Sequence, residues 1–346
     1  MGVPSFQETR TLTGDGDLYI FVNVKSFTST MGSALSQTFF GFYWQKVEEL
    51  VFGKSLNNVG ISMDLEARGI RQRSFMHNSG ASDGLLALTK TSGFAPTPAS
   101  FLPGEAQTFS SFSFNPQELD KIVRAVAQIA MSFSSEGGNI DALFEQQVGV
   151  KLKDLMGSLG LKAHYFSPVP ASGNPMEALN IALELKDEAP LKGLVSKFMV
   201  GPAGGASPEK YKDTEIYSMP LPTGELALAF TGKSLLLAGS KSLAKKVIDR
   251  AGDPSASSAG GDEFKSLAST LGVPPVVCLL NYSSKAYMEY SLQSMGESLK
   301  SVGVDGVDQI APVLNALKDV LGASIGYGVW KEKGIYADSL LLYRNP

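Results

Sequence analysis

The sequence predicts an α+β protein, with mainly antiparallel sheets and amphipathic helices packed on them. Several short segments alternate apolar residues with small or polar ones, which is typical of antiparallel strands with one packed face. Longer segments with apolar residues at helical spacing lie between them, and glycine-containing turns join some strands into hairpins. At 346 residues the chain is long for one domain. We therefore expect two α+β units, residues 1–168 and 169–346, that share a core or sheet.

The strand assignments rest on alternation and on short apolar runs. Residues 18–24 form a continuous apolar run, so we expect this strand to be central in its sheet and buried. Cys278 lies in a second apolar run, residues 276–280, and is expected to be a small buried side chain. Alternating strands are predicted at 59–65, 70–76, 109–114, 179–185, 226–230, 234–238, 324–329 and 335–343.

The helices are predicted from apolar spacing and from their starts. Ser33 is a candidate N-cap for a helix that reaches about Phe52. Asn115 offers a cap oxygen, Pro116 suits the first turn, and Glu118 lies three residues after the cap. Further helices are expected at 241–251, 262–271, 284–301 and 307–321.

The two ends of the chain have matching patterns, which predicts an internal repeat. In residues 15–80 and again in 274–346, a strand ending in Asn leads into helices and then into a hairpin with a glycine at its turn. Repetition of a half-buried unit implies that the copies share one sheet or one core. The fold is therefore expected to contain repeated strand–helix–hairpin units.

Composition argues against several function classes. The net charge is −4 and no basic stripe occurs, so a nucleic-acid partner is not expected. The single cysteine and the two isolated histidines give no metal-ligand spacing, and we expect no cofactor. No window approaches the ~20 apolar residues of a membrane-spanning helix. The first residues lack a basic segment followed by an apolar one, so we expect no signal peptide.

One segment carries the pattern of a serine nucleophile. The G-x-S-x-G pattern occurs at Gly80-Ala81-Ser82-Asp83-Gly84. In a hydrolase this segment forms a strained turn between a strand and a helix that exposes the serine. The order of Ser82, then Asp141 or Asp154, then His164 suits that class. A glycine- and serine-rich loop also gives this pattern by chance, so no catalytic residue is assigned.

An aromatic cluster is the most distinctive local feature, and it comprises Phe39, Phe40, Phe42, Tyr43 and Trp44. These side chains cover more of a helix than one packing stripe needs. One interpretation is a helix buried between a sheet and a second element. The other is an apolar groove for a lipid, a peptide or a membrane-bound partner, with Phe40 and Trp44 as its candidate surface.

Five stretches of the chain resemble one family. They are residues 18–24, residues 59–76 with 84–88, residues 98–100 with 109–126, residues 148–155 with 159–160, and residues 217–240. Together they resemble an uncharacterised bacterial family of predicted exported or membrane-anchored proteins, a domain of unknown function. The resemblance implies an extracytoplasmic location, periplasmic or in the cell envelope. It supplies no activity, and no functional residue is carried over.

These observations lead to two hypotheses about function. The first is a non-enzymatic binding or structural protein, extracytoplasmic or part of a membrane-associated assembly, with a protein partner. The alternative is a serine hydrolase that uses Ser82. A distance of more than about 6 Å between Ser82 Oγ and every histidine nitrogen would exclude the alternative, because the base could not reach the nucleophile.

Overall fold

The fold is described from a computed structural model. It describes residues 4–36, 38, 41–78, 83–131, 139–170, 179–200, 208–221, 224–252, 260–301 and 307–344.

The strands are β1 (Leu18–Asn23), β2 (Leu56–Glu66), β3 (Gly69–Asn78), β4 (Thr108–Ser113), β5 (Leu159–Ser167), β6 (Asn180–Leu185), β7 (Glu209–Tyr211), β8 (Thr214–Leu221), β9 (Gly224–Thr231), β10 (Ser234–Ala238), β11 (Leu279–Ser283), β12 (Leu321–Lys331) and β13 (Gly334–Tyr343). The helices are α1 (Pro4–Thr13), α2 (Val24–Leu35), α3 (Gly41–Val51), α4 (Gly84–Leu88), α5 (Pro116–Met131), α6 (Ile140–Val148), α7 (Leu152–Ser158), α8 (Ala189–Val195) with the π-helical turn η2 (Ser196–Val200), α9 (Lys241–Gly252), α10 (Gly261–Leu271), α11 (Lys285–Ser301) and α12 (Val307–Val320).

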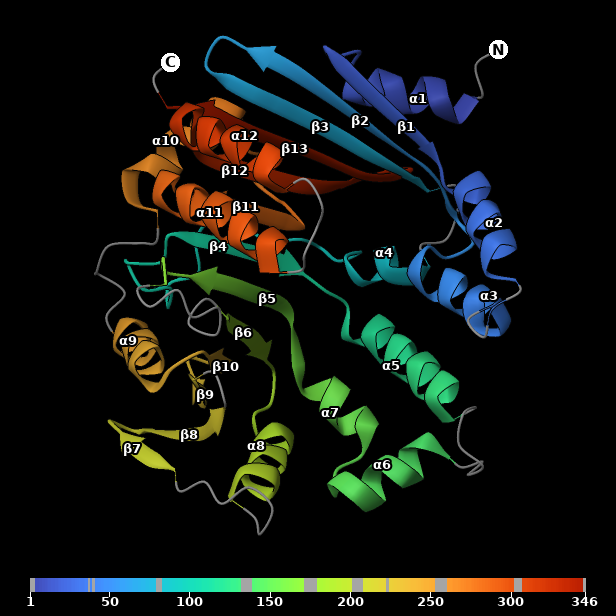
Figure 1. Ribbon diagram of the computed structural model, residues 1–346. Helices are drawn as coiled ribbons and strands as arrows, with labels where there is room; N and C mark the ends of the chain where they lie inside the picture. Colours follow the sequence, from blue (N-terminus) through green and yellow to red (C-terminus); the bar gives the residue numbers. More distant parts are fainter. Residues whose placement is uncertain are drawn as a thin grey trace.

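The strands form one long antiparallel sheet, which confirms the predicted fold class (Figure 1). Within the described residues the order is β1-β2-β3-β13-β12-β11-β4-β5-β6-β10-β9-β8-β7. Strands β11 to β13, near the end of the chain, lie between β3 and β4. Strands from the two expected units, residues 1–168 and 169–346, are thus interleaved in the same sheet.

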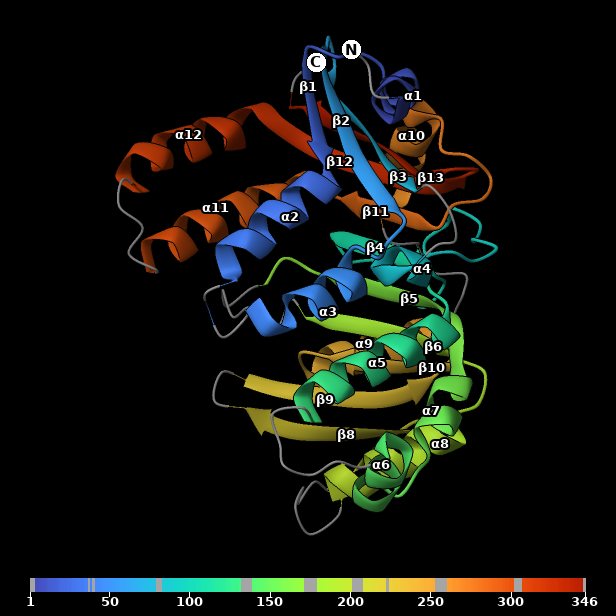
Figure 2. The ribbon, with the colours of Figure 1, turned by 90° about the vertical axis from the view of Figure 1, so that its right-hand side faces the viewer.

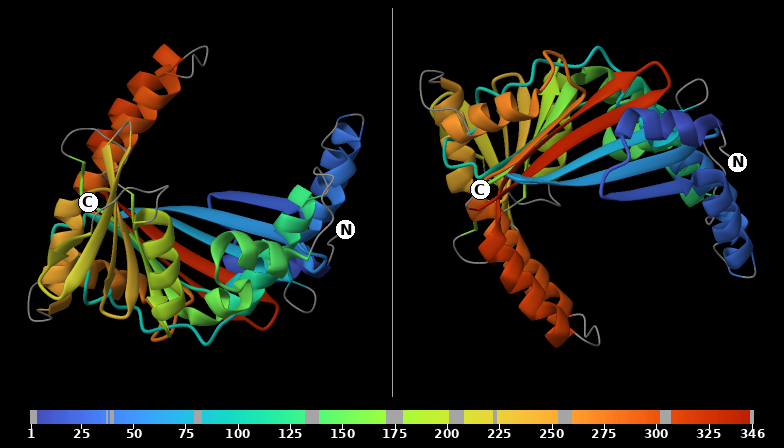
Figure 3. Two further views of the ribbon diagram at one scale, coloured as in Figure 1. Left: turned by 90° about the horizontal axis from the view of Figure 1, so that it is seen from below. Right: turned by 90° about the horizontal axis from the view of Figure 1, so that it is seen from above.

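The main core lies on one face of this sheet, which we call the covered face. Side chains of α9 and α10 pack there against strands β4, β5, β10, β11 and β12, and α1 contacts β2 and β3 on the same side. Figures 2 and 3 show α1 and α10 together on this side of the upper strands. The large side chains on this face that are less than 2% exposed include Phe75, Phe109, Phe166, Leu236, Leu280 and Ile325.

The hairpins form where the sequence predicts them. The β2–β3 turn lies between Glu66 and Gly69, and the β12–β13 turn lies between Lys331 and Gly334. In the β9–β10 turn, Gly232 and Lys233 both have positive φ, 56° and 60°. Two successive residues with positive φ give the tight turn whose twist matches the flanking strands. These local features explain why the hairpins are readable from sequence.

The predicted single helix from Ser33 to Phe52 is wrong. The structure has α2, which begins directly after β1, and a separate α3 that begins at Gly41. The N-cap is Asn23, whose side chain accepts a hydrogen bond from the Ser26 N–H at 2.9 Å. Ser33 lies inside α2, and its hydroxyl donates to the Ser29 carbonyl. The apolar spacing continues through both helices and therefore conceals the break between them.

The prediction that residues 18–24 form a central, buried strand is also wrong. Strand β1 lies at one end of the sheet order, and Leu18, Ile20 and Val22 are 52%, 42% and 37% exposed. The alternate side chains Tyr19 and Phe21 meet the ring of Phe6 on α1. An apolar run on both faces of a strand is thus compatible with an edge position when a helix packs on only one face.

The two ends of the chain share one order of elements. The first runs β1-α2-α3-β2-β3 and the second runs β11-α11-α12-β12-β13. In the sheet the two groups meet where β3 pairs with β13. Whether residues 15–80 superpose on residues 274–346 stays a prediction, which different backbone paths of the two segments would contradict.

Candidate functional site

On the second face of the sheet, helices α5, α7 and α8 pack against β5, β6, β9 and β10, but apolar side chains of β1, β2, β4 and β11 stay accessible. We call this surface the open face. Its exposed members are Leu18, Ile20, Val22, Leu65, Phe112 and Leu279, which are 36% to 66% exposed. They come from β1, β2, β4 and β11, strands that are far apart in the sequence. Exposed apolar groups that share one surface are typical of interaction sites.

The register of the strands places these side chains on the same face. One row of directly opposed residues crosses seven neighbouring strands, from β1 to β4: Ile20, Ile61, Ser74, Ala337, Gly328, Leu279 and Phe112. Directly opposed residues in antiparallel strands point to the same side of a sheet. The row therefore has bulky apolar side chains at both ends and small ones in the middle.

Two helical hairpins extend from the same side as the open face. The first arm, α2–α3, connects β1 to β2, and the second arm, α11–α12, connects β11 to β12. Figures 2 and 3 show both arms projecting away from the sheet on the side opposite α1 and α10. Leu292 and Leu314 of the second arm pack near Leu341 of β13, which shares the open face because it is opposed to Ser324.

Of the two aromatic residues predicted as a partner surface, Trp44 is described and Phe40 is not. Phe39 and Phe40 lie outside the described residues, as do the side chains of Phe42 and Tyr43. Trp44 is half-buried between the two helices of the first arm, where its indole N–H donates to the Thr28 carbonyl at 3.2 Å. Its contact with Gly32 is close, because a Cβ at that glycine would lie 3.0 Å from the indole ring. Trp44 therefore joins α2 to α3.

Ser82, the nucleophile of the alternative hydrolase hypothesis, lies outside the described residues together with Gly80 and Ala81. Its neighbour Asp83 accepts hydrogen bonds from the Lys54 N–H at 2.8 Å and the Ser55 N–H at 3.2 Å, and from the Ser55 hydroxyl. Burial alone would raise the pKa of Asp83, but these hydrogen bonds lower it below its usual value. Asp83 is thus an ionised acceptor that fixes the segment after α3.

The structure brings His164 together with a different serine. His164 Nδ1 and the Ser111 hydroxyl share a hydrogen bond of 2.8 Å on the covered face. Burial lowers the pKa of His164 to about 4, so the imidazole is neutral at pH 7. The two residues are 7% and 1% exposed. A substrate carbonyl cannot reach this hydroxyl in the described conformation, and the pair serves to satisfy two buried polar groups.

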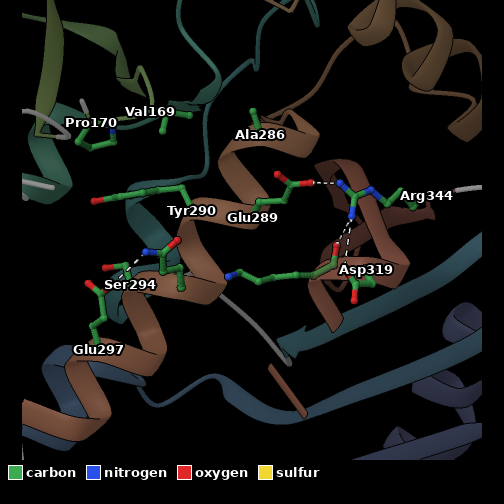
Figure 4. Close-up of a pocket in the computed structure, with 11 residues that line it drawn as sticks. Val169, Pro170, Ala286, Glu289, Tyr290, Ser294, Glu297, Asp319 and Arg344 are labelled. Carbon is green, nitrogen blue, oxygen red and sulfur yellow. Dashed lines mark hydrogen bonds and ion pairs between the residues drawn. The ribbon is translucent and has the colours of Figure 1, made fainter. Parts of the chain in front are cut away.

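A cavity with a volume of about 760 Å³ lies beside the second arm (Figure 4). Tyr290 extends toward Val169 and Pro170 at one side of it. At the other side Arg344 forms ion pairs with Glu289 and, at 3.6 Å, with Asp319. We call this space the arginine cavity. Because two carboxylates already neutralise its guanidinium, it offers a ligand little uncompensated charge.

The described residues offer no other reactive site of the kinds that hold a metal ion or a thiol nucleophile. They contain no group of three or more His, Cys, Asp or Glu side chains placed to hold a metal ion. Cys278 is 4% exposed, as predicted, and burial raises the pKa of its thiol to about 11, which makes it a poor nucleophile. None of the described helices combines the length and the apolar character needed to cross a bilayer.

Comparisons with known proteins give no functional assignment. No model of a known protein family matches the chain, and no curated protein matches it. Among solved structures, crystal form I of TP0453 is similar with a TM-score of 0.35 and 12% identity, over 70% of this chain and 77% of that chain. Crystal form III of TP0453 is similar with a TM-score of 0.35 and 13% identity, over 72% and 81%. A likeness this weak says nothing about function.

Sequence reasoning identified the strands of the open face but not the surface itself. The usable signal was the alternation of Ile61 with small and polar neighbours in β2, and the run of glycines at alternate positions in β12. Such alternation shows that a strand has two unlike faces. It does not show which face helices cover, because the covering helices come from distant parts of the chain.

Proposed function

We propose that this chain is a non-enzymatic binding protein that holds a protein partner on the open face, between the two helical arms. The observation that carries the proposal is the row of open-face side chains from Ile20 to Phe112, flanked by α2–α3 and α11–α12. Burial of a large apolar side chain is worth roughly 1.5–3 kcal/mol. A partner that covers several of them would gain a substantial driving force for association.

The shape of the surface favours a macromolecular partner over a small ligand. Its exposed members lie on strands as far apart in the sheet as β1 and β4. Small-molecule sites enclose most of the ligand surface, whereas this surface is broad and bounded by the arms on two sides. The exposed apolar residues Val313 and Val320 on α12 and Phe27 on α2 extend the apolar surface onto the arms.

We further propose that the partner belongs to an extracytoplasmic, membrane-associated assembly. This part rests on the resemblance to exported and membrane-anchored bacterial proteins stated above. The location can be tested by fusing the chain to a reporter that is active only in the periplasm and by cell fractionation. Recovery of the protein in the cytoplasm alone would contradict this location and leave the binding surface to be judged separately.

The binding surface is tested by native pull-down with mass spectrometry on matched variants. The double variant Ile20→Ser with Phe112→Ser removes two exposed apolar groups from the open face. The control, Val126→Ser with Phe198→Ser, removes two side chains that are 50% and 47% exposed elsewhere. We expect the open-face variant to lose a partner that the wild type and the control retain. Equal recovery of every partner by both variants would overturn the proposal.

A further inference from the structure

A second cavity, separate from the open face and from the arginine cavity, carries an excess of positive charge. It has a volume of about 640 Å³ and lies where the start of α5, α7, the segment after α4 and the residue after β6 meet. We call it the lysine cavity after its cationic lining residues, which are Lys90, Lys121, Arg124, Lys153 and Lys186. One carboxylate, Asp120, shares the lining. This volume suits a small organic ligand.

Two of the five cations already have carboxylate partners. Arg124 binds Asp120 at 2.8 Å and Asp141 at 2.8 and 2.9 Å, and Lys121 binds Glu118 at 2.7 Å. These pairs neutralise the one acidic group of the lining. They also fix α5 to the start of α6, and so give the cavity a wall with little freedom to move.

The other three cations, Lys90, Lys153 and Lys186, have no carboxylate within ion-pair distance among the described residues. The wall thus keeps three uncompensated charges although the whole chain has a net charge of −4. Like charges around one concave surface raise its positive potential and attract anions. The lysine cavity thus differs from the arginine cavity, in which carboxylates neutralise the guanidinium.

Trp330 lies beside one of the lysines, and Thr91 adds a hydrogen-bond donor to the cavity. Lys90 Nζ lies 5.5 Å from the centroid of the Trp330 ring, and the Trp330 N–H donates to the Thr89 carbonyl at 2.8 Å. The Thr91 hydroxyl oxygen accepts from the Gly93 N–H at 3.1 Å, which leaves its own proton able to donate. Apolar groups, Leu161 among them, complete the lining.

We propose that the lysine cavity binds a small soluble phosphate monoester with an apolar or aromatic body. Three uncompensated ammonium groups match a phosphate monoester, which carries about −1.5 to −2 charges at pH 7, better than they match a monoanionic carboxylate. Hydroxyl and ammonium donors suit its three terminal oxygens. The apolar lining accommodates the rest of the molecule. A phospholipid head group shares this chemistry but carries less charge when it is a diester.

The test is a calorimetric titration of the intact chain with phenyl phosphate at low ionic strength. The variant is Lys153→Gln with Lys186→Gln, and the control of equal charge is Lys210→Gln with Lys331→Gln, two exposed lysines on β7 and β12. We expect the cavity variant to weaken the affinity at least about tenfold, because two charge-assisted hydrogen bonds are lost. The control should bind like the wild type. Thermal unfolding of both variants should match the wild type, because neither pair of lysines forms an ion pair among the described residues.

Three results would overturn the proposal. They are no saturable binding of phenyl phosphate by the wild type, equal loss of affinity in variant and control, and equally tight binding of benzoate, which has one charge. A parallel arm uses phosphatidylglycerol vesicles. Vesicle binding that the cavity variant loses, without binding of phenyl phosphate, would assign the cavity to a lipid head group and refute a soluble ligand. The open-face variant should bind phenyl phosphate normally, so failure of either proposal is separable from the other.

Discussion

Identical side chains close together on one strand differ in exposure when they point to different faces of the sheet. On β4, Phe109 is fully buried and Phe112 is 37% exposed. On β11, Leu280 is fully buried and the adjacent Leu279 is 36% exposed. Each pair has the same side chain in the same strand. The packed helices, and not the strands, therefore decide which apolar side chains enter the core.

The reason lies in where the connecting helices pack. Helices α9 and α10 lie against the covered face and contribute Val247, Phe264 and Leu267 to the same core as Phe109. In each arm the two helices pack on each other and on a neighbouring strand, β2 or β12, and the two arms leave the sheet at opposite ends of the strands. The open face between them keeps accessible apolar area, and burial of that area by a partner would favour association.

The phenylalanine pair of β4 should show the largest difference in stability between the two faces. Phe109→Ala should lower the free energy of unfolding by about 3–5 kcal/mol, because it leaves a cavity among Phe264 and Tyr282, whose rings touch Phe109. Phe112→Ala should cost about 1 kcal/mol or less, because its side chain is partly exposed already. Urea unfolding of both variants measures the difference. Similar losses would mean that both faces are equally packed in solution.

The buried His164 on the covered face should make the free energy of unfolding depend on pH. His164 is neutral in the folded state, with a pKa of about 4, and ordinary in the unfolded chain, near 6.5. The unfolded state therefore binds a proton first, and the free energy of unfolding falls as the pH drops from about 6.5 to about 4. The contribution is on the order of 3 kcal/mol.

His164→Gln should remove this part of the pH dependence. The measurement compares urea unfolding of wild type and variant at pH 7 and pH 4.5, so that the acidic groups common to both cancel. We expect the stability of the wild type relative to the variant to fall by about 2–3 kcal/mol between pH 7 and pH 4.5. A difference that is independent of pH would show that His164 is hydrated in the folded protein, and a difference that rises at pH 4.5 would show that it is paired with an acid.

The parts of the fold that local chemistry determines could be predicted from the sequence. The β12–β13 hairpin follows from alternation and from Gly334, whose φ of 148° is costly for other residues. The start of α5 follows from Asn115, whose side chain accepts from the Gln117 N–H at 3.0 Å. In both cases the deciding contacts join residues close in the chain.

The candidate sites could not be predicted, because their contacts are not local. The lysine cavity draws Lys90, Lys153 and Lys186 from segments that no short motif connects. The edge position of β1 cannot be predicted from its sequence, because an apolar run does not reveal whether a strand has one neighbour or two. The break between α2 and α3 cannot be predicted from apolar spacing, because the apolar residues of the two helices, Trp44 among them, follow one continuous pattern.

A smaller effect on stability is expected at Trp44 in the first arm. The indole contributes one hydrogen bond to Thr28 and packs against Gly32, but it is only half-buried. Trp44→Ala should therefore lower the free energy of unfolding by about 2 kcal/mol, less than a fully buried aromatic. The conservative control is Trp44→Phe, which keeps the ring and removes the N–H. Unchanged stability with lost partner binding would instead make Trp44 part of the binding surface.

The smallest effect is expected at Leu279, and its comparison with Leu280 in the same strand, β11, shows whether the open face is covered. Leu280→Ala should cost about 2–5 kcal/mol, whereas Leu279→Ala should change the free energy of unfolding by about 1 kcal/mol or less. The prediction for Leu279 assumes that the open face is uncovered when the chain is alone. If the chain associated with itself through this face, Leu279 would be buried in the assembly, and its loss would cost nearly as much as that of Leu280. The apparent stability would then also rise with protein concentration, because association stabilises the folded state by mass action. Unfolding curves of both variants at two concentrations tenfold apart therefore separate an open surface that awaits a partner from one that a second copy already covers.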